Sequence, residues 1–162
     1  MKLVRIIPAI LSVLSLSAWA APMDLDAGLR ASIWDENYDL GVGGELGLIY
    51  PASPAVDLGL HLNYTQYTAK TVDFEDVQEM TAYIGLYFVA YDDGSLRFRI
   101  GPHAGGGTFD GWAVDLGGDA TAVFKIMEKT SIYATFIPAY IIGANSQGVF
   151  KVGFGVEYRI GG

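Results

Sequence analysis

The sequence predicts an all-β protein, an eight-stranded antiparallel up-and-down β-barrel. Three observations predict this fold. Apolar and polar residues alternate along eight segments, short and long connections alternate between the segments, and glycines and charges gather opposite the apolar positions. Successive side chains of a β-strand point to opposite faces, so this alternation gives each strand one apolar and one polar face. The segment 150–160 alternates without exception, since its even positions are all apolar and its odd positions are all glycine or charged.

Apolar positions with a period of two mark the predicted strands. They run over 25–33, 40–50, 56–64, 80–90, 96–104, 114–126, 132–142 and 150–160. With the residues beside them, these segments supply the roughly 9–11 residues that a tilted strand needs to cross a bilayer. Pro102 and Pro138 lie on the apolar face inside two of the segments. Proline cannot donate a ladder hydrogen bond, so we expect a bulge or a local break at each.

The connections between the predicted strands fall into two sets. The first set is compact and rich in turn-forming residues, and consists of 51–55, 92–95 and 127–130. The second set is mostly longer or more acidic, and consists of 35–39, 68–77, 108–115 and the shorter 143–148. Short turns at one end and longer loops at the other are typical of an up-and-down meander with an even number of strands.

The N-terminus has the form of a secretory signal peptide. A short basic start precedes an apolar run that ends at Ala18-Trp19-Ala20, a small-x-small cleavage site. We expect residues 1–20 to be removed and residues 21–162 to form a single barrel domain with a net charge of −10. Such an acidic surface does not attract nucleic acid. No long apolar run remains after cleavage, which excludes a helical membrane protein, and the sequence has no cysteine for a disulfide.

The polar face decides whether the barrel is soluble or embedded in a membrane. Glycines on a solvated outer face would weaken the strands without any structural benefit. Inside a narrow eight-stranded barrel they leave room for other side chains. The apolar face then meets lipid, and no charge interrupts it in the strand centres. Aromatic residues at both ends of this face match the girdles of membrane barrels. They are Tyr50, Phe88, Phe98, Phe124 and Tyr158 at the short-turn end, and Tyr64, Tyr140 and Phe150 at the loop end. The sequence therefore predicts a transmembrane β-barrel.

Over residues 24–160 this pattern, preceded by a signal peptide, resembles the small eight-stranded outer-membrane barrels of the OmpA/OmpX type. The resemblance is one of overall pattern and not of a residue motif. It implies a Gram-negative outer-membrane protein with both termini in the periplasm. With the loop asymmetry, this places the short turns in the periplasm and the second set of connections on the cell exterior. Many members end on an aromatic residue, whereas this chain ends Ile160-Gly161-Gly162.

The barrel interior is expected to hold a polar network. Its predicted members are Arg30, Glu45, His61, Arg99, His103, Asp119 and Glu157. Centring the first hairpin on 35–39 places Arg30 opposite Glu45, and centring the second on 51–55 places Glu45 opposite His61. Directly opposed unlike charges favour such a register. The same arithmetic places His103 opposite Asp119. The alternative is that each charge contacts trapped water.

The sequence predicts no catalytic, cofactor or metal site. His61 and His103 lack cysteine partners and the spacing of metal ligands. A nucleophilic serine needs a base within hydrogen-bond reach, and no serine is placed beside a histidine at equal depth. The segment 101–107, GPHAGGG, lacks the lysine and the following helix of a phosphate-binding loop. The acidic loops 35–39 and 72–77 could gather divalent cations that bridge to lipopolysaccharide, but solvated loop charge is the more usual explanation.

We therefore predict a monomeric outer-membrane barrel with no large pore and a non-catalytic role in envelope structure or surface interactions. Its partners would be outer-membrane lipid and lipopolysaccharide, with no nucleic acid. Two alternatives remain open. One is an enzyme that modifies lipid A, because some small outer-membrane barrels add or remove its acyl chains. The other is a soluble exported barrel that binds an apolar ligand inside.

Overall fold

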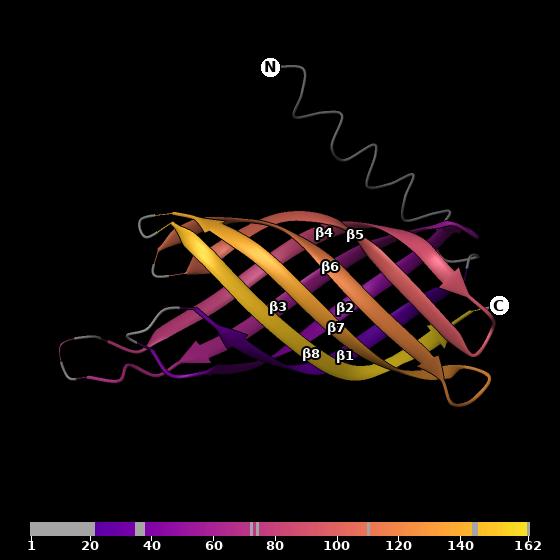
Figure 1. Ribbon diagram of the computed structural model, residues 1–162, viewed down its shortest axis with the longest axis horizontal. Helices are drawn as coiled ribbons and strands as arrows, with labels where there is room; N and C mark the ends of the chain where they lie inside the picture. Colours follow the sequence, from indigo (N-terminus) through magenta and orange to yellow (C-terminus); the bar gives the residue numbers. More distant parts are fainter. Residues whose placement is uncertain are drawn as a thin grey trace, which may run out of the picture.

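Eight antiparallel strands close into a barrel in the computed structural model (Figure 1), which describes residues 22–34, 38–71, 73, 75–109, 111–143 and 146–161. The strands are β1 (Met23–Ile33), β2 (Gly41–Ser53), β3 (Val56–Tyr67), β4 (Val77–Asp92), β5 (Leu96–Phe109), β6 (Trp112–Lys125), β7 (Thr130–Ile142) and β8 (Gln147–Ile160). Each strand pairs with its neighbours in the sequence, and β1 also pairs with β8 to close the barrel. The predicted fold class is confirmed.

The predicted signal peptide, residues 1–20, lies outside the described residues. None of the residues that the structure describes forms a helix long and apolar enough to cross a membrane.

The two prolines interrupt the strand pairing on one side only. At Pro102, β5 pairs with β6 without a gap. The pairing of β5 with β4 is interrupted at Pro102, and the register is the same on both sides of the interruption. Pro138 pairs with β8, and the interruption lies on the side of β6. The expected local breaks are therefore present, as the missing N–H of proline requires. The register shifts lie elsewhere, one between Pro51 and Ser53 in β2 and one near the end of β4.

The short turns lie at the same end of the barrel as the C-terminus and the start of β1 (Figure 1). They consist of residues 54–55, 93–95 and 126–129. In the turn 93–95, Gly94 has a φ of 84°, which glycine adopts at little cost. The Asp93 carboxylate accepts hydrogen bonds from the backbone N–H groups of Leu96 and Ser95 at 2.8 and 2.9 Å. These bonds lower the pKa of Asp93.

One connection at the loop end is much tighter than predicted. The expected loop 108–115 is mostly strand, because β5 extends to Phe109 and β6 begins at Trp112. Gly111 has a φ of 108°, and its carbonyl accepts the Phe109 N–H at 2.6 Å. A glycine-rich strand end resembles a loop in sequence, which explains the error. The connection between β3 and β4, residues 68–76, projects furthest from the barrel (Figure 1).

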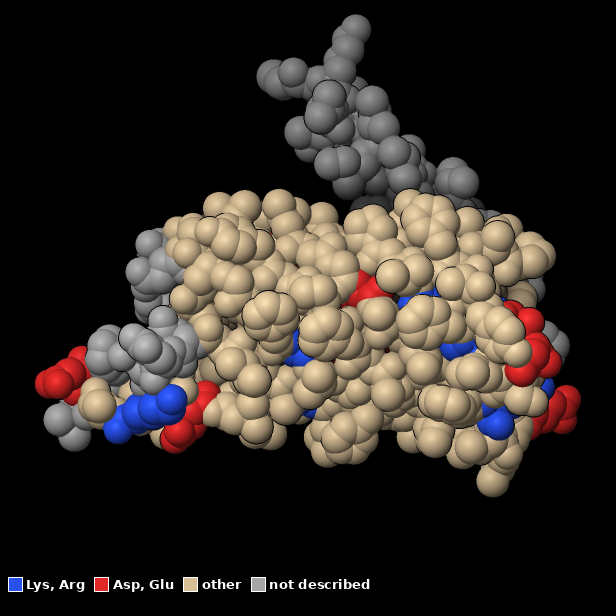
Figure 2. Space-filling view, viewed as in Figure 1, with Lys and Arg blue, Asp and Glu red and all other residues tan. Residues whose placement is uncertain are grey.

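The outer wall of the barrel is apolar. Large side chains at alternate positions of the strands project outward, among them Leu29 (58% exposed), Ile84 (66%) and Phe154 (64%). Figure 2 shows charged residues at the two ends, with mainly uncharged side chains over the wall between them. Soluble monomers rarely expose contiguous apolar patches larger than a few hundred Å². An apolar band around a whole barrel is instead the surface that lipid covers. The apolar faces of the strands therefore point outward, as predicted.

The predicted aromatic girdles also lie on the outer surface. Seven of the eight residues are exposed, and Phe98 is half-buried. The exposed ones are Tyr50, Phe88, Phe124 and Tyr158 at the short-turn end, and Tyr64, Tyr140 and Phe150 at the loop end.

Candidate functional site: the barrel interior

Glycines make room for a polar interior. Gly47 lies opposite His61 in the ladder, and a Cβ on it would lie 2.7 Å from both Asp26 Oδ2 and His61 Nδ1. A Cβ on Gly155 would lie 2.3 Å from the carbonyl oxygen of Ala27. The space that these glycines leave is occupied by side chains and backbone of neighbouring strands. An eight-stranded barrel has an interior just wide enough for its own side chains, which explains the need for glycine.

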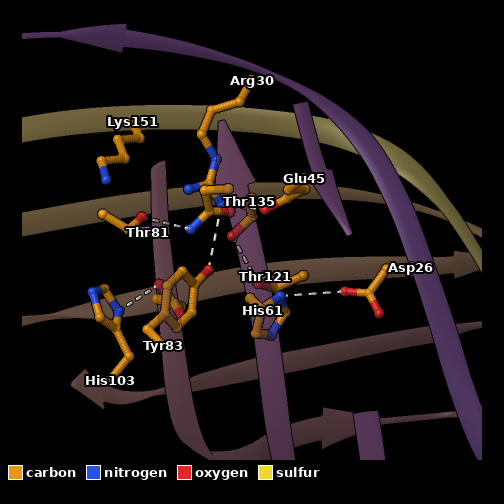
Figure 3. Close-up of polar contacts among 12 residues, drawn as sticks. Asp26, Arg30, Glu45, His61, Thr81, Tyr83, His103, Thr121, Thr135 and Lys151 are labelled. Atoms are coloured by element: carbon orange, nitrogen blue, oxygen red, sulfur yellow. Dashed lines mark hydrogen bonds and ion pairs between the residues drawn. The ribbon is translucent and has the colours of Figure 1, made fainter. Parts of the chain in front are cut away.

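Arg30 of β1 and Glu45 of β2 form an ion pair inside the barrel (Figure 3). Arg30 is 1% exposed and Glu45 is 5% exposed. Arg30 Nη2 also donates to the Tyr83 hydroxyl at 3.3 Å, and the Tyr133 hydroxyl donates to Glu45 Oε1 at 2.7 Å. A buried carboxylate is tolerated when it is both paired and hydrogen-bonded. Glu45 meets both conditions, because Arg30 pairs with it and Tyr133 of β7 donates to it, while Tyr83 of β4 contacts Arg30.

The two histidines are linked through Tyr87 and Asp119. The Tyr87 hydroxyl lies 3.1 Å from His61 Nε2 and donates to Asp119 Oδ2 at 2.7 Å. The other oxygen, Asp119 Oδ1, lies 3.0 Å from His103 Nδ1. On its far side, His103 Nε2 lies 3.2 Å from Asp115 Oδ1. Polar contacts therefore connect β3, β4, β5 and β6 across the interior, and both ring nitrogens of His103 face carboxylates.

A second buried ion pair, Lys151 with Glu79, extends the network toward the loop end. Lys151 Nζ also lies 3.4 Å from Asp115 Oδ2. The Tyr67 hydroxyl donates to Glu79 Oε2 at 3.1 Å and contacts Ser32 Oγ at 2.7 Å. These contacts join β1, β3, β4, β6 and β8, so strands on opposite sides of the barrel are held together.

Arginine pairs fill the interior toward the short-turn end. Arg99 Nη2 donates to Glu157 Oε2 at 2.7 Å, and Arg99 Nη1 lies 3.8 Å from Asp57 Oδ2. Arg97 Nη2 donates to the other oxygen, Asp57 Oδ1, at 2.7 Å. Asp57 therefore lies between two guanidinium groups, and the carboxylates of β3 and β8 are both neutralised from β5.

The lumen is filled rather than open. The cavity among the polar residues measures about 20 Å³, close to the space that one water needs. At the loop end an apolar cluster follows the polar network. It consists of Tyr67, Val77, Phe109, Ala113, Ile141 and Val149, with Trp34 and Tyr38 packed against it. Trp34 stacks on Tyr38 with ring centroids 4.4 Å apart, and meets Phe109 edge-on at 4.4 Å.

The predicted register of the first hairpin is wrong by two residues. Arg30 lies opposite Gly43, and Glu45 lies opposite Gly28. The ion pair between Arg30 and Glu45 is present, but it runs diagonally across the ladder and not between directly opposed residues. Both opposed positions are glycines, and their lack of side chains opens the space for the diagonal contact.

The second predicted hairpin register is also wrong. Glu45 lies opposite Asn63, while His61 lies opposite Gly47. His61 instead has Asp26 as its nearest carboxylate, with Nδ1 3.7 Å from Oδ2 (Figure 3). The predicted position of Glu45 between Arg30 and His61 is therefore incorrect.

His103 shows the same diagonal displacement. It lies opposite Gly117 in the ladder, and Asp119 lies opposite Gly101. The two side chains nevertheless meet, as described above. Arg99 and Glu157 belong to the arginine pairs at the short-turn end. All seven residues predicted for the interior network are buried there.

Sequence reasoning missed about half of the network. The missed buried members include Asp26, Asp57, Tyr67, Glu79, Tyr83, Tyr87, Asp115, Tyr133 and Lys151. All lie on the polar face of their strands, so the period of two is the signal that identifies them. The tyrosines were hidden because aromatic residues in membrane barrels are usually assigned to the outer girdles. Their hydroxyl groups need partners when buried, which suits them to this interior.

The interior offers hydrogen bonds and ion pairs without an arranged nucleophile among the described residues. Ser32 contacts Tyr67, and Ser146 Oγ donates to the backbone carbonyl of Gly143. Neither histidine contacts a serine, and both nitrogens of His103 already face carboxylates. Within the described ranges no three His, Asp or Glu side chains gather in a way that could hold a metal ion.

An apolar wall around a closed, polar interior defines a transmembrane β-barrel. No family model matches the chain, and no curated protein matches it. Solved structures of outer-membrane proteins do share its fold.

OprG from Pseudomonas aeruginosa has a TM-score of 0.62 at 12% identity, covering 88% of this chain and 97% of that one. Ail, the attachment invasion locus protein of Yersinia pestis, has a TM-score of 0.59 at 17% identity, covering 87% of this chain and 99% of that one. A major outer membrane protein from Thermus thermophilus has a TM-score of 0.57 at 15% identity, covering 87% of this chain and 100% of that one. The chain therefore has the fold of small outer-membrane β-barrels.

The fold alone does not define a role. A de novo designed transmembrane β-barrel also matches, with a TM-score of 0.50 at 15% identity over 87% of this chain and 97% of that one. The same architecture thus occurs in natural proteins and in a designed barrel, so function has to be argued from the site.

Proposed function

We propose that this chain is a monomeric integral outer-membrane protein with a non-catalytic role in envelope structure or surface interaction. The observation that carries the proposal is the pairing of an apolar wall with an interior that its own ion pairs fill. Lys151 with Glu79 and Arg99 with Glu157 hold non-adjacent strands together across the lumen, and Arg30 with Glu45 joins the neighbouring strands β1 and β2 from inside it. Such an interior favours a rigid support over a conduit or a ligand cavity.

The loop end supports a role in surface contacts. The connection 68–76 projects from the barrel and carries the acidic residues Asp73, Glu75 and Asp76. Tyr38 and Ala69 form a bridge that ties the β1–β2 connection to this loop. In the proposed orientation these residues face the cell exterior, where lipopolysaccharide and extracellular partners are met.

Orientation can be tested by inserting one epitope at Asp73 and another at Asp93 and labelling intact cells. We expect antibody to reach the tag at Asp73 and not the tag at Asp93. Labelling at Asp93 alone would reverse the proposed orientation, and permeabilised cells serve as the control for tag accessibility.

The non-catalytic role is tested by mass spectrometry of lipid A from cells with and without the protein. We expect identical acyl-chain patterns, because the described serines have no histidine partner and His103 has no free ring nitrogen. A lipid A species that depends on the protein would identify an enzyme and reject the proposed role.

A further inference from the structure

Asp26 and His61 face each other inside the barrel with incomplete hydrogen bonding (Figure 3). Asp26 belongs to β1 and is 3% exposed, and His61 belongs to β3 and is 7% exposed. His61 Nδ1 lies 3.7 Å from Asp26 Oδ2, which is longer than a hydrogen bond. Within the described part of the chain, neither His61 Nδ1 nor Asp26 Oδ1 has a hydrogen-bond partner. Buried polar atoms are rarely left unpaired, so this pair requires a physical explanation.

The hydrogen bonds of Tyr87 determine which nitrogen of His61 carries a hydrogen. The single hydroxyl hydrogen of Tyr87 is donated to Asp119 Oδ2 at 2.7 Å, because a carboxylate can only accept. The Tyr87 oxygen is therefore an acceptor toward His61 Nε2, which lies 3.1 Å away and must carry the hydrogen. A neutral imidazole has a hydrogen on one nitrogen alone, so Nδ1 of a neutral His61 presents a lone pair to Asp26. If Asp26 were also ionised, two acceptors would face each other with no hydrogen between them.

Among the described residues, no arginine is left to neutralise Asp26. Two guanidinium groups act on the pair from other strands, and both already serve other carboxylates. They are Arg30, which pairs with Glu45, and Arg99, which donates to Glu157 at 2.7 Å. Glu157 also lies directly opposite Asp26 in the β1–β8 ladder, where like charges destabilise. A buried carboxylate without a compensating charge is strongly unfavourable, so Asp26 is not expected to stay ionised beside a neutral His61.

The other groups that face the pair supply no positive charge. They are Tyr83 and Tyr87 of β4, Asp119 of β6 and Tyr133 of β7, while Gly47 of β2 lies opposite both residues in the ladder. The tyrosines are neutral at neutral pH, and Asp119 adds a further negative charge, which Tyr87 and His103 stabilise. In the part of the chain that the structure describes, a proton held by the pair itself is therefore what can neutralise Asp26.

We propose that Asp26 and His61 form a proton-binding site in the barrel interior and hold one proton between them at neutral pH. The proton lies on Asp26, which then donates to His61 Nδ1, or on Nδ1, which then donates to Asp26, and in both forms the pair has no net charge. The contact is direct or runs through one water, for which the cavity of about 20 Å³ that both residues line has room. Raising the pH withdraws the proton and leaves a buried carboxylate uncompensated. This site is independent of the envelope role proposed above.

Asp26→Asn tests the site, because an amide NH₂ donates to His61 Nδ1 as a protonated carboxyl does but takes up no proton. Urea unfolding in liposomes is measured for wild type and the variant between about pH 7 and pH 9, where the unfolded chain holds an ionised aspartate and a neutral histidine. Folding of the wild type then binds one proton more than folding of the variant, and stability falls with rising pH where the native state binds more protons. The folding equilibrium constant of wild type, relative to that of Asp26→Asn, should fall about tenfold per pH unit until the folded pair releases its proton.

Asp24→Asn is the matched control for this measurement. Asp24 lies on the same strand and face as Asp26, but it pairs with Arg159 at 2.9 Å and is ionised in both the folded and the unfolded chain over this pH range. Its loss should therefore lower stability by the same factor at every pH. Parallel pH profiles of wild type and Asp26→Asn would overturn the proposal, as would an equal change of slope in Asp24→Asn.

Nitrogen NMR of the wild type in micelles, with isotope-labelled histidine, gives a second readout that does not depend on the folding of any aspartate variant. The sequence has two histidines, so His61→Gln assigns the signals. At neutral pH we expect Nε2 of His61 to be protonated, and Nδ1 to be either protonated or the acceptor of a hydrogen bond. An Nδ1 that is neither protonated nor hydrogen-bonded at neutral pH would show that the pair holds no proton.

Discussion

Arg30 and Glu45 form a buried ion pair although neither lies opposite the other in the strand ladder. Arg30 is opposite Gly43, and Glu45 is opposite Gly28. The side chains meet diagonally because the two opposed glycines leave the space free. This ion pair inside the barrel therefore depends on glycines at the opposed positions.

Glu45→Ala should destabilise the barrel more than the double change Glu45→Ala with Arg30→Ala. The single variant leaves a buried guanidinium without its carboxylate, which costs about 3–5 kcal/mol, whereas the double variant removes the stranded charge. Urea unfolding in liposomes of wild type, both single variants and the double variant measures the difference. Strictly additive losses would show that the two side chains do not interact.

Gly43→Ala should destabilise strongly, whereas Gly44→Ala should be close to neutral. A Cβ on Gly43 would lie 1.8 Å from the Tyr64 carbonyl oxygen, and a Cβ on Gly44 would lie 3.3 Å from the nearest atom, the Gly28 carbonyl oxygen. Forcing the ladder apart costs about 1–3 kcal/mol or more. Adjacent glycines in one strand provide a matched pair for the same unfolding measurement. Equal stability of the two variants would contradict the inward facing of Gly43.

Phe154→Arg should reduce stable insertion, because Phe154 projects from the lipid-facing wall and is 64% exposed. An arginine near the middle of the apolar band costs about 2–4 kcal/mol. Phe154→Leu is the suitable control. Gly155→Ser looks mild from sequence, but its Cβ would clash with the Ala27 carbonyl oxygen. The folded fraction after refolding into liposomes is the measurement, and equal yields for the arginine and leucine variants would invert the assigned faces.

The pure protein should show no stable porin-like conductance in planar bilayers. Its interior cavity is only about 20 Å³, and the apolar cluster around Trp34 and Phe109 closes the loop end. Reproducible large single-channel steps would show that the interior opens in a bilayer. A known porin in the same apparatus provides the positive control.

The faces of the strands could be predicted from the sequence because parity depends on local alternation alone. Phe154 and Gly155 are assigned to opposite faces whatever the rest of the chain does. Even the unpredicted members of the network, such as Tyr87 and Asp115, obey the same parity. Alternation therefore determines which side chains face the outer wall and which face the lumen.

Register could not be predicted in the same way, because it depends on turn geometry and bulges. The second hairpin turns at residues 54–55 and not around residue 53, and the tight turn at Gly111 replaces an expected loop. An error of two residues preserves parity, so it leaves every side chain on the right face but changes its direct partner. His103 still meets Asp119 and Arg30 still meets Glu45, both diagonally, whereas Glu45 does not pair with His61.

The central claim, that the apolar face meets lipid, is tested most directly by spin-label accessibility in liposomes. The chain has no cysteine, so Leu46→Cys, Ile84→Cys, Phe154→Cys and Asp93→Cys each give a single labelling site. Labels at the first three positions should be reached by oxygen, which dissolves in lipid, and protected from a water-soluble nickel complex. The label at Asp93 should show the reverse. If the nickel complex reached the three wall positions as readily as Asp93, the apolar face would be exposed to water and the barrel would not span the membrane.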